Sequence, residues 1–331
     1  MFGNTPLHIA IENGSKECCL YLLDKGADAN IRNKNSAAAI HQCVITNQPD
    51  ILDLLLSHES KIDIHLGGEN GATALHYCAD TDNLECCKVL IKYNSNLCKP
   101  CNNGFFPIHT AAQRSANKVL EFLIEHGNTK GCSRLKMLSF VDGDNNKPLH
   151  AAVQFGNIDA VKLCLENGAS IDETMEIDNS TPVHVACSQG SIEILKLMAD
   201  KQLDVFVQVV FMQDSMQMTP LHKAAMFDHV EIAKYLIEKG AYIDSLDKEK
   251  RSPMLLAASR NCVKMVCYLI SEGASIKLRD NKLRNLLHLV INLEYKNYAQ
   301  NNSSESNFSI GQYQSNTITS LEKVICELIK V

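Results

Sequence analysis

The hydrophobic residues of this chain come in short helical blocks that are separated by polar turns. Residues 7–11 form one such block, Leu-His-Ile-Ala-Ile, and a turn at residues 13–14 follows it. Residues 231–237 illustrate a second kind of block, whose apolar residues recur with the three-to-four-residue spacing of an amphipathic helix. The second block ends at a Gly-Ala pair, as at residues 240–241, where glycine can adopt the left-handed conformation that closes a helix. The pattern predicts pairs of short helices that must stack on neighbours to bury their apolar faces.

A four-residue motif, Thr-Pro-Leu-His in its clearest form, opens each predicted pair. Copies start at residues 5, 38, 73, 106, 147, 181, 219, 252 and 285, which are 33, 35, 33, 41, 34, 38, 33 and 33 residues apart. The hydroxyl can cap the helix, and proline is tolerated at the first helical position because the N–H it lacks has no partner there. A 33-residue period with this motif resembles the ankyrin repeat. The sequence therefore predicts an all-α solenoid of about nine helix-turn-helix repeats, joined by short β-hairpin-like turns.

The predicted repeats occupy residues 1–33 (with a truncated start), 34–68, 69–101, 102–142, 143–176, 177–214, 215–247, 248–280 and 281–331. The fourth repeat carries a long connection, and the sixth contains an insertion at 205–211, whose β-branched residues predict an extended edge or a wedge packed on the stack. In the ninth repeat, the polar segment 296–316 is predicted to be a disordered loop. Polar capping repeats are missing at both ends, which predicts a fragment of a longer protein.

The motif histidines have two possible interpretations, a dispersed metal or catalytic set or a structural element. They occur once per repeat, which spaces them too widely for one tetrahedral metal site. We therefore expect each ring to hydrogen-bond backbone in the turn between repeats. The predicted structural motif residues are Thr5, His8, His41, Thr73, His76, His109, His150, Thr181, His184, Thr219, His222 and His288.

The 14 cysteines do not follow the spacing of a disulfide framework, and a chain of this length with a real apolar core does not need one. Most of them occupy helix positions that predict burial; Cys18 and Cys86, for example, align with Ile232. Four positions are candidates for exposed thiols, two in an isolated Cys-x-x-Cys and two at helix positions that lysine holds in other repeats. They are Cys98, Cys101, Cys267 and Cys326.

Composition and charge exclude several functional classes. The net charge of −6 is not that of a general nucleic-acid or anionic-membrane binder. The sequence has neither a signal peptide nor the roughly 20 consecutive apolar residues of a membrane-spanning helix. No motif of a nucleotide-binding loop, a hydrolase or a zinc protease is present. We therefore expect no catalytic activity, no metal and no cofactor, and a chain with reduced thiols in the cytosol or nucleus.

The polar tips of the turns between repeats are candidate contacts for protein partners, as in other repeat arrays. These predicted tip residues are Asn33, Lys34, Glu69, Asn70, Asn102, Asn103, Lys248, Glu249, Asn281 and Lys282.

Beyond the generic motif, the chain resembles the N-terminal array of the ankyrin-type transient receptor potential (TRPA) cation channels. The resemblance is clearest at 221–229, 235–244 and 283–289, and it extends upstream through 68–74 and 106–109 to the first motif at 4–8. It includes the long connection at 132–134, so the array is interrupted at the same joint. The polar insertion in the ninth repeat departs from the family.

This resemblance implies a cytosolic array that hangs from a homotetrameric, calcium-permeable channel of the plasma membrane, in a family that responds to electrophiles, temperature or mechanical stimuli. The linker that carries the family's electrophile-sensing cysteines is not part of this sequence, so that role is assigned to no cysteine here. An alternative remains open, in which the chain is a free-standing soluble ankyrin adaptor that binds proteins through its hairpin tips and concave helices.

Overall fold

A computed structural model describes residues 3–58, 61–127 and 133–291 of the 331-residue chain. The described residues form helices and turns, and none of them lies in a β-strand, in agreement with the predicted all-α fold. The chain divides into two compact units, one formed by residues 1–170 and 175–177 and the other by 171–174 and 178–331. The predicted loop at 296–316 lies outside the described residues.

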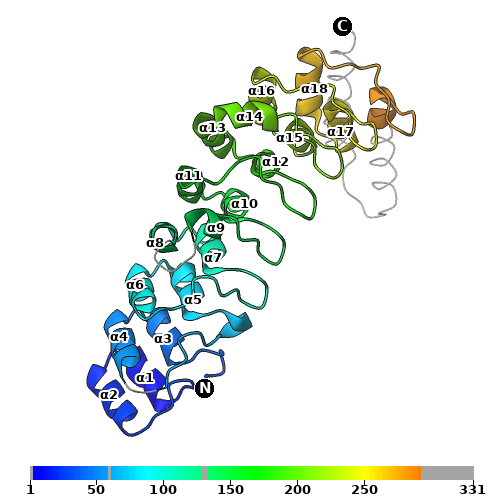
Figure 1. Ribbon diagram of the computed structural model, residues 1–331. Helices are drawn as coiled ribbons and strands as arrows, with labels where there is room; N and C mark the ends of the chain where they lie inside the picture. Colours follow the sequence, from blue (N-terminus) through cyan, green and yellow to red (C-terminus); the bar gives the residue numbers. More distant parts are fainter. Residues whose placement is uncertain (1–2, 59–60, 128–132, 292–331) are drawn as a thin grey trace, which may run out of the picture. The chain divides into compact units, whose positions relative to one another are not determined.

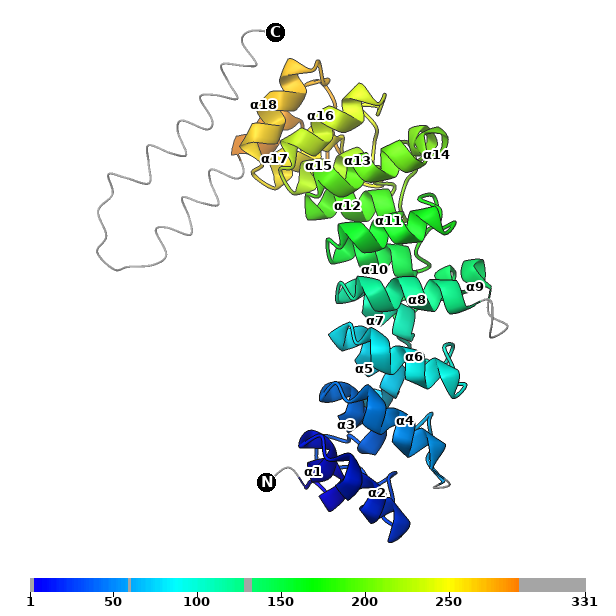
Figure 2. The ribbon, with the colours of Figure 1, turned by 90° about the vertical axis from the view of Figure 1, so that its left-hand side faces the viewer.

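The first unit consists of successive helix pairs, in which a helix that begins at the motif is followed by an amphipathic helix (Figures 1 and 2). Its helices are α1 Pro6–Glu12, α2 Lys16–Asp24, α3 Ala39–Ile45, α4 Pro49–Ser57, the 3-10 turn η1 Glu69–Gly71, α5 Ala74–Thr81, α6 Leu84–Lys92, α7 Pro107–Gln113, α8 Asn117–Gly127, α9 Arg134–Leu138, α10 Pro148–Gln154 and α11 Ile158–Glu166.

The second unit repeats the arrangement with one extra helix. Its helices are α12 Pro182–Gln189, α13 Ile192–Lys201, α14 Leu203–Val209, α15 Pro220–Met226, α16 Val230–Glu238, α17 Pro253–Ser259 and α18 Val263–Ser271.

Within each unit, the helices that begin at the motif pack on one another in a row, and the amphipathic helices pack in a second row. In the first unit α1, α3, α5, α7 and α10 form one row, while α2, α4, α6, α8 and α11 form the other. Alanine, leucine, isoleucine and cysteine fill the space between the rows, and Leu75, Leu90 and Leu120 are fully buried there. Stacking therefore supplies the apolar partner that no single helix pair could provide.

Six of the buried motif histidines join the start of their own helix to the following turn. In the third repeat, the backbone N–H of Thr73 donates to His76 Nδ1 over 3.1 Å, so Nδ1 is an acceptor and the proton must lie on Nε2. Nε2 then donates to the carbonyl oxygen of Phe105 over 2.8 Å. The same Nε2 contact joins His8 to Ala37, His41 to Leu66, His109 to Asn146, His184 to Met218 and His222 to Arg251. His288 differs, because it is exposed and its Nδ1 contacts Asn285.

Burial of these rings makes the folded chain less stable in acid. Burial lowers the pKa of His41, His109 and His184 to about 4. The unfolded chain, with histidine pKa values near 6.5, binds protons between about pH 6.5 and 4 that the folded chain does not, so stability falls as the pH falls through this window. At about pH 5.5 the loss is about 1.4 kcal/mol for each of these histidines. Urea unfolding followed by circular dichroism at pH 7.5 and 5.5 measures it, and equal midpoints would contradict the assignment.

The two insertions fold as helices that lie against the stack. The long connection after α8 contains α9, which packs on α8 and buries Met137 and Leu138. The segment 205–211 lies mainly in α14, which follows α13 after Gln202 and packs on it. The extended alternative predicted for this segment is wrong, and the packed wedge is what the structure shows. Burial of Phe206, together with Val209 and Val210, outweighs the weak helix preference of the valines.

Candidate functional site

A buried acceptor organises the turns that lead into the motif. In the turn that leads into the eighth repeat, Asp247 Oδ1 accepts the backbone N–H groups of Glu249 and Arg251 over 2.9 and 2.8 Å. Oδ2 pairs with the Arg251 guanidinium, and the Asp247 side chain is only 1% exposed. The same acceptor role is filled by Asn33, Asp142, Asp214 and Asp280 in other turns. These turns are therefore rigid supports for the residues at their tips.

The predicted tip residues divide between the two units, and backbone bonds join neighbouring tips. In the first unit, Asn102 N–H donates to the carbonyl of Asn70 over 2.8 Å. In the second unit, Asn281 N–H donates to the backbone carbonyl of Glu249 over 2.9 Å. Asn33 differs from the other tip residues, because its side chain is already hydrogen-bonded. Its Oδ1 accepts backbone N–H groups of its own turn, and its Nδ2 donates to Asn4. Lys34, Lys248 and Lys282 are exposed.

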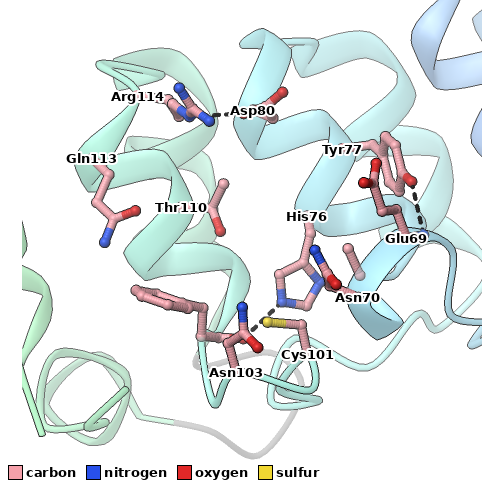
Figure 3. Close-up of a pocket in the computed structure, with 12 residues that line it drawn as sticks. Glu69, Asn70, His76, Tyr77, Asp80, Cys101, Asn103, Thr110, Gln113 and Arg114 are labelled. Carbon is pink, nitrogen blue, oxygen red and sulfur yellow. Dashed lines mark hydrogen bonds and ion pairs between the residues drawn. The ribbon is translucent and has the colours of Figure 1, made fainter. Parts of the chain in front are cut away.

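A groove of about 300 Å³ lies between the third and fourth repeats, in the first unit (Figure 3). From the helix side, α5 contributes Tyr77 and Asp80, and the α7 region contributes Thr110, Gln113 and Arg114. Since Tyr77 and Asp80 are three residues apart, as are Thr110 and Gln113, each pair presents neighbouring side chains on one helix face.

The turns close the other side of this groove. Glu69 and Asn70 come from the tip before α5, and Cys101, Asn103 and Phe105 come from the tip before α7. Asn70 has a φ of 51°, a left-handed conformation that asparagine tolerates better than most residues. The groove thus brings together the predicted tip residues Glu69, Asn70 and Asn103 with Cys101.

Three contacts fix the two walls of the groove relative to each other. At the helix end, Arg114 Nε pairs with Asp80 Oδ1 at 2.9 Å. At the base, His76 Nε2 donates to the Phe105 carbonyl, as described above. The third contact is the backbone bond between the two tips. Tyr77 Oη in addition accepts the N–H of Glu69 over 3.2 Å, which holds the tip against α5.

Several polar side chains of the groove make no hydrogen bond within the described part of the chain. They are the carboxamides of Asn70, Asn103 and Gln113, the hydroxyl of Thr110 and the carboxylate of Glu69. Glu69 also has no ion pair among the described residues, whereas the charges of Asp80 and Arg114 compensate each other. The groove therefore offers hydrogen-bonding groups and one uncompensated negative charge to a ligand.

The thiols are distributed differently from the prediction. Cys98, Cys101 and Cys267 are half-buried, and Cys326 lies outside the described residues. Cys18, predicted to be buried, is exposed, although its counterpart Ile232 is 1% exposed. The face that carries Cys18 is uncovered among the described residues and borders an apolar cavity of about 650 Å³.

Burial makes the interior thiols weak acids. It raises the pKa of Cys19 to about 11 and those of Cys86 and Cys164 to about 12. Because the thiolate is the nucleophile, these buried cysteines are protonated and unreactive at neutral pH.

Two features of the described residues bear on other functions. Residues 3–58, 61–127 and 133–291 contain no group of three histidine, cysteine or acidic side chains placed to hold a metal ion. In the same ranges, every helix is too short or too polar to cross a membrane.

Sequence reasoning named the concave helices as a binding face but singled out none of the helix residues of the groove. Positions 77, 80, 110, 113 and 114 fall outside the motif, so the repeat pattern assigns them no role. The signal that could have found them is the polarity of the helix face after the motif, because a purely structural face between two repeats would be apolar.

Comparisons with known proteins agree with the repeat pattern. A family model described as ankyrin repeats (three copies) matches residues 2–67, 40–134 and 206–280, and one described as ankyrin repeats (many copies) matches 140–199. The solved ankyrin repeat domain of human ASB11 superimposes with a TM-score of 0.55 at 24% identity, covering 65% of this chain and 90% of that one.

Among curated proteins, the chain is similar to the human transient receptor potential cation channel subfamily A member 1, with 40% identity over 294 residues. This match covers 89% of the chain but 26% of the channel. The Drosophila melanogaster protein of the same name is 46% identical over 193 residues, covering 58% of the chain and 16% of that protein. Human Rabankyrin-5 is 30% identical over 175 residues, covering 52% of the chain and 14% of that protein. The chain therefore corresponds to about a quarter or less of these relatives, and by its repeats, its fold and the matching family models it belongs to the ankyrin-repeat family.

Proposed function

We propose that this chain is a cytosolic ankyrin-repeat region of a TRPA-like, calcium-permeable cation channel, in which four copies surround one pore. The observation that carries the proposal is the 40% identity to the human channel, which extends over 294 residues and so includes the irregular joints as well as the repeat motif. Generic similarity between ankyrin repeats is lower, as the 24% identity to the ASB11 domain illustrates.

In this proposal the array is a regulatory and interaction surface without catalytic activity. Ankyrin repeats mediate protein interaction, and the rigid turns and exposed tips described above are suited to it. The division into nine repeats stays a prediction. The second candidate is a free-standing adaptor, and the 30% identity to human Rabankyrin-5 over 175 residues shows that similar repeats occur in a protein whose name is not that of a channel.

Sequencing the complete transcript, followed by expression of its product in cultured cells, tests the channel proposal. We expect the reading frame to continue into six segments of about 20 apolar residues and the product to support calcium entry. A reading frame that ends at Val331 and begins at Met1 would contradict the channel and leave the adaptor.

A further inference from the structure

The groove between α5 and α7 has the properties of a recognition site that is rigid before its ligand arrives. The Asp80–Arg114 ion pair, the His76 bond to Phe105 and the backbone bond between the tips hold its walls. A site that is already ordered loses little conformational freedom when it binds, which favours affinity. Its volume of about 300 Å³ lies at the lower end of the range of ligand sites, roughly 300–1,000 Å³.

The chemistry of the lining favours a polypeptide over an apolar small molecule. Each carboxamide of Asn70, Asn103 and Gln113 carries an N–H₂ donor and a C=O acceptor, the same pair that a peptide group presents. Figure 3 shows these three side chains among the residues that line the groove. An extended peptide exposes its N–H and C=O groups along its length, so it can pair with several carboxamides at once.

The charge of the groove determines which kind of peptide side chain it favours. Arg114 pairs with Asp80 at 2.9 Å, so the opposite charges of these two residues compensate each other within the groove. Glu69 is exposed and has no ion pair among the described residues. A cation placed at Glu69 would compensate the one unbalanced charge of the site, and the net charge of −6 favours the approach of a basic partner.

We infer that the groove between α5 and α7 binds an extended polypeptide segment and receives one arginine or lysine side chain of that segment at Glu69. The inference names the partner chemistry of the interaction surface in the proposed function. It rests on that surface binding proteins and not on the presence of a pore.

Selection of short random peptides displayed on phage tests the inference with the purified chain. Peptides selected on the wild-type chain are expected to be enriched in arginine or lysine at one position, and those selected on Glu69→Gln are not. Glu121→Gln is the matched control, because Glu121 is an exposed acid on α8 outside the groove. Selection that yields no binders at all, or binders without a basic residue, would overturn the inference.

Affinity measurements on one selected peptide identify the contact. Replacing its arginine by citrulline, which has the same shape but no charge, should weaken binding to the wild-type chain about three- to tenfold. The same replacement should have no effect on binding to Glu69→Gln, whereas Asn103→Ala should weaken both peptides alike. Equal loss on the wild-type chain and on Glu69→Gln would place the cation elsewhere. Failure of the transcript test would leave these results unaffected, so the two proposals can fail separately.

Discussion

Replacing Asp247 by alanine is expected to lower the free energy of unfolding of the second unit by about 3 to 5 kcal/mol. The carboxylate is buried and holds two backbone N–H groups and the Arg251 guanidinium. Its removal leaves those donors without their acceptor and leaves the charge of Arg251, whose side chain is only 15% exposed, without its main partner. Because Arg251 also supplies the carbonyl that accepts from His222, the contact between two repeats is weakened at the same time.

Urea unfolding of the variant, followed by circular dichroism, gives the loss. Glu249→Ala is the matched control, because Glu249 lies in the same turn and meets the same arginine, but at 3.4 Å and with 40% of its side chain exposed. We expect that control to change stability by less than about 1 kcal/mol. Asp247→Asn keeps an oxygen for the two N–H groups and should lose less than the alanine variant. A loss for Asp247→Ala no larger than that of Glu249→Ala would show that the turn does not depend on the buried carboxylate.

The fold was predictable because its causes are local and repeat along the chain. Threonine, proline and histidine at the motif each act within a few residues, so the helix starts follow from the sequence alone. Thr181 illustrates this, since its hydroxyl accepts from the N–H of His184 and its own N–H donates to the His184 ring. The hydrogen bond from each histidine to the next turn could be predicted from the repeat period alone, because one repeat later a carbonyl such as that of Met218 lies within reach of Nε2.

Predictions failed where the outcome depended on a neighbour that the motif does not describe. Cys18 aligns with a buried isoleucine, yet burial at this position requires a preceding repeat, and none of the described residues covers it. The groove shows the same limit. Its tip residues could be proposed from their polarity. The pairing of Asp80 with Arg114 could not, because these residues are 34 positions apart in the sequence and meet only through the packing of two repeats.

For the insertion in the sixth repeat, the packed wedge is what the structure shows, and the extended alternative was wrong for a different reason. Its valines favour an extended chain in isolation, but tertiary packing routinely overrides so weak a preference. Phe206 decides the outcome, since its side chain is fully buried and its ring centroid lies 6.1 Å from that of Tyr235. Tyr235 is in α16, so the insertion is anchored to the following repeat as well as to α13.

The second large expected effect tests this anchoring. Phe206→Ala should destabilise the second unit by about 3 to 5 kcal/mol, because the phenyl ring loses its burial and the site can collapse only partly around the smaller side chain. Hydrogen exchange should then show faster exchange in α14 than in α17, which α14 does not contact closely.

Phe211→Ala separates the effect of packing from the loss of an aromatic ring as such. Phe211 is 39% exposed and contacts Tyr242 at a ring distance of 4.7 Å, so its removal should cost only about 1 kcal/mol. If α14 were a loosely attached decoration, both variants would unfold at nearly the same urea concentration as the wild-type chain. A large loss for Phe206→Ala alone would instead show that the insertion has become part of the core, which is the reason the array can interrupt its 33-residue period here without losing the stack.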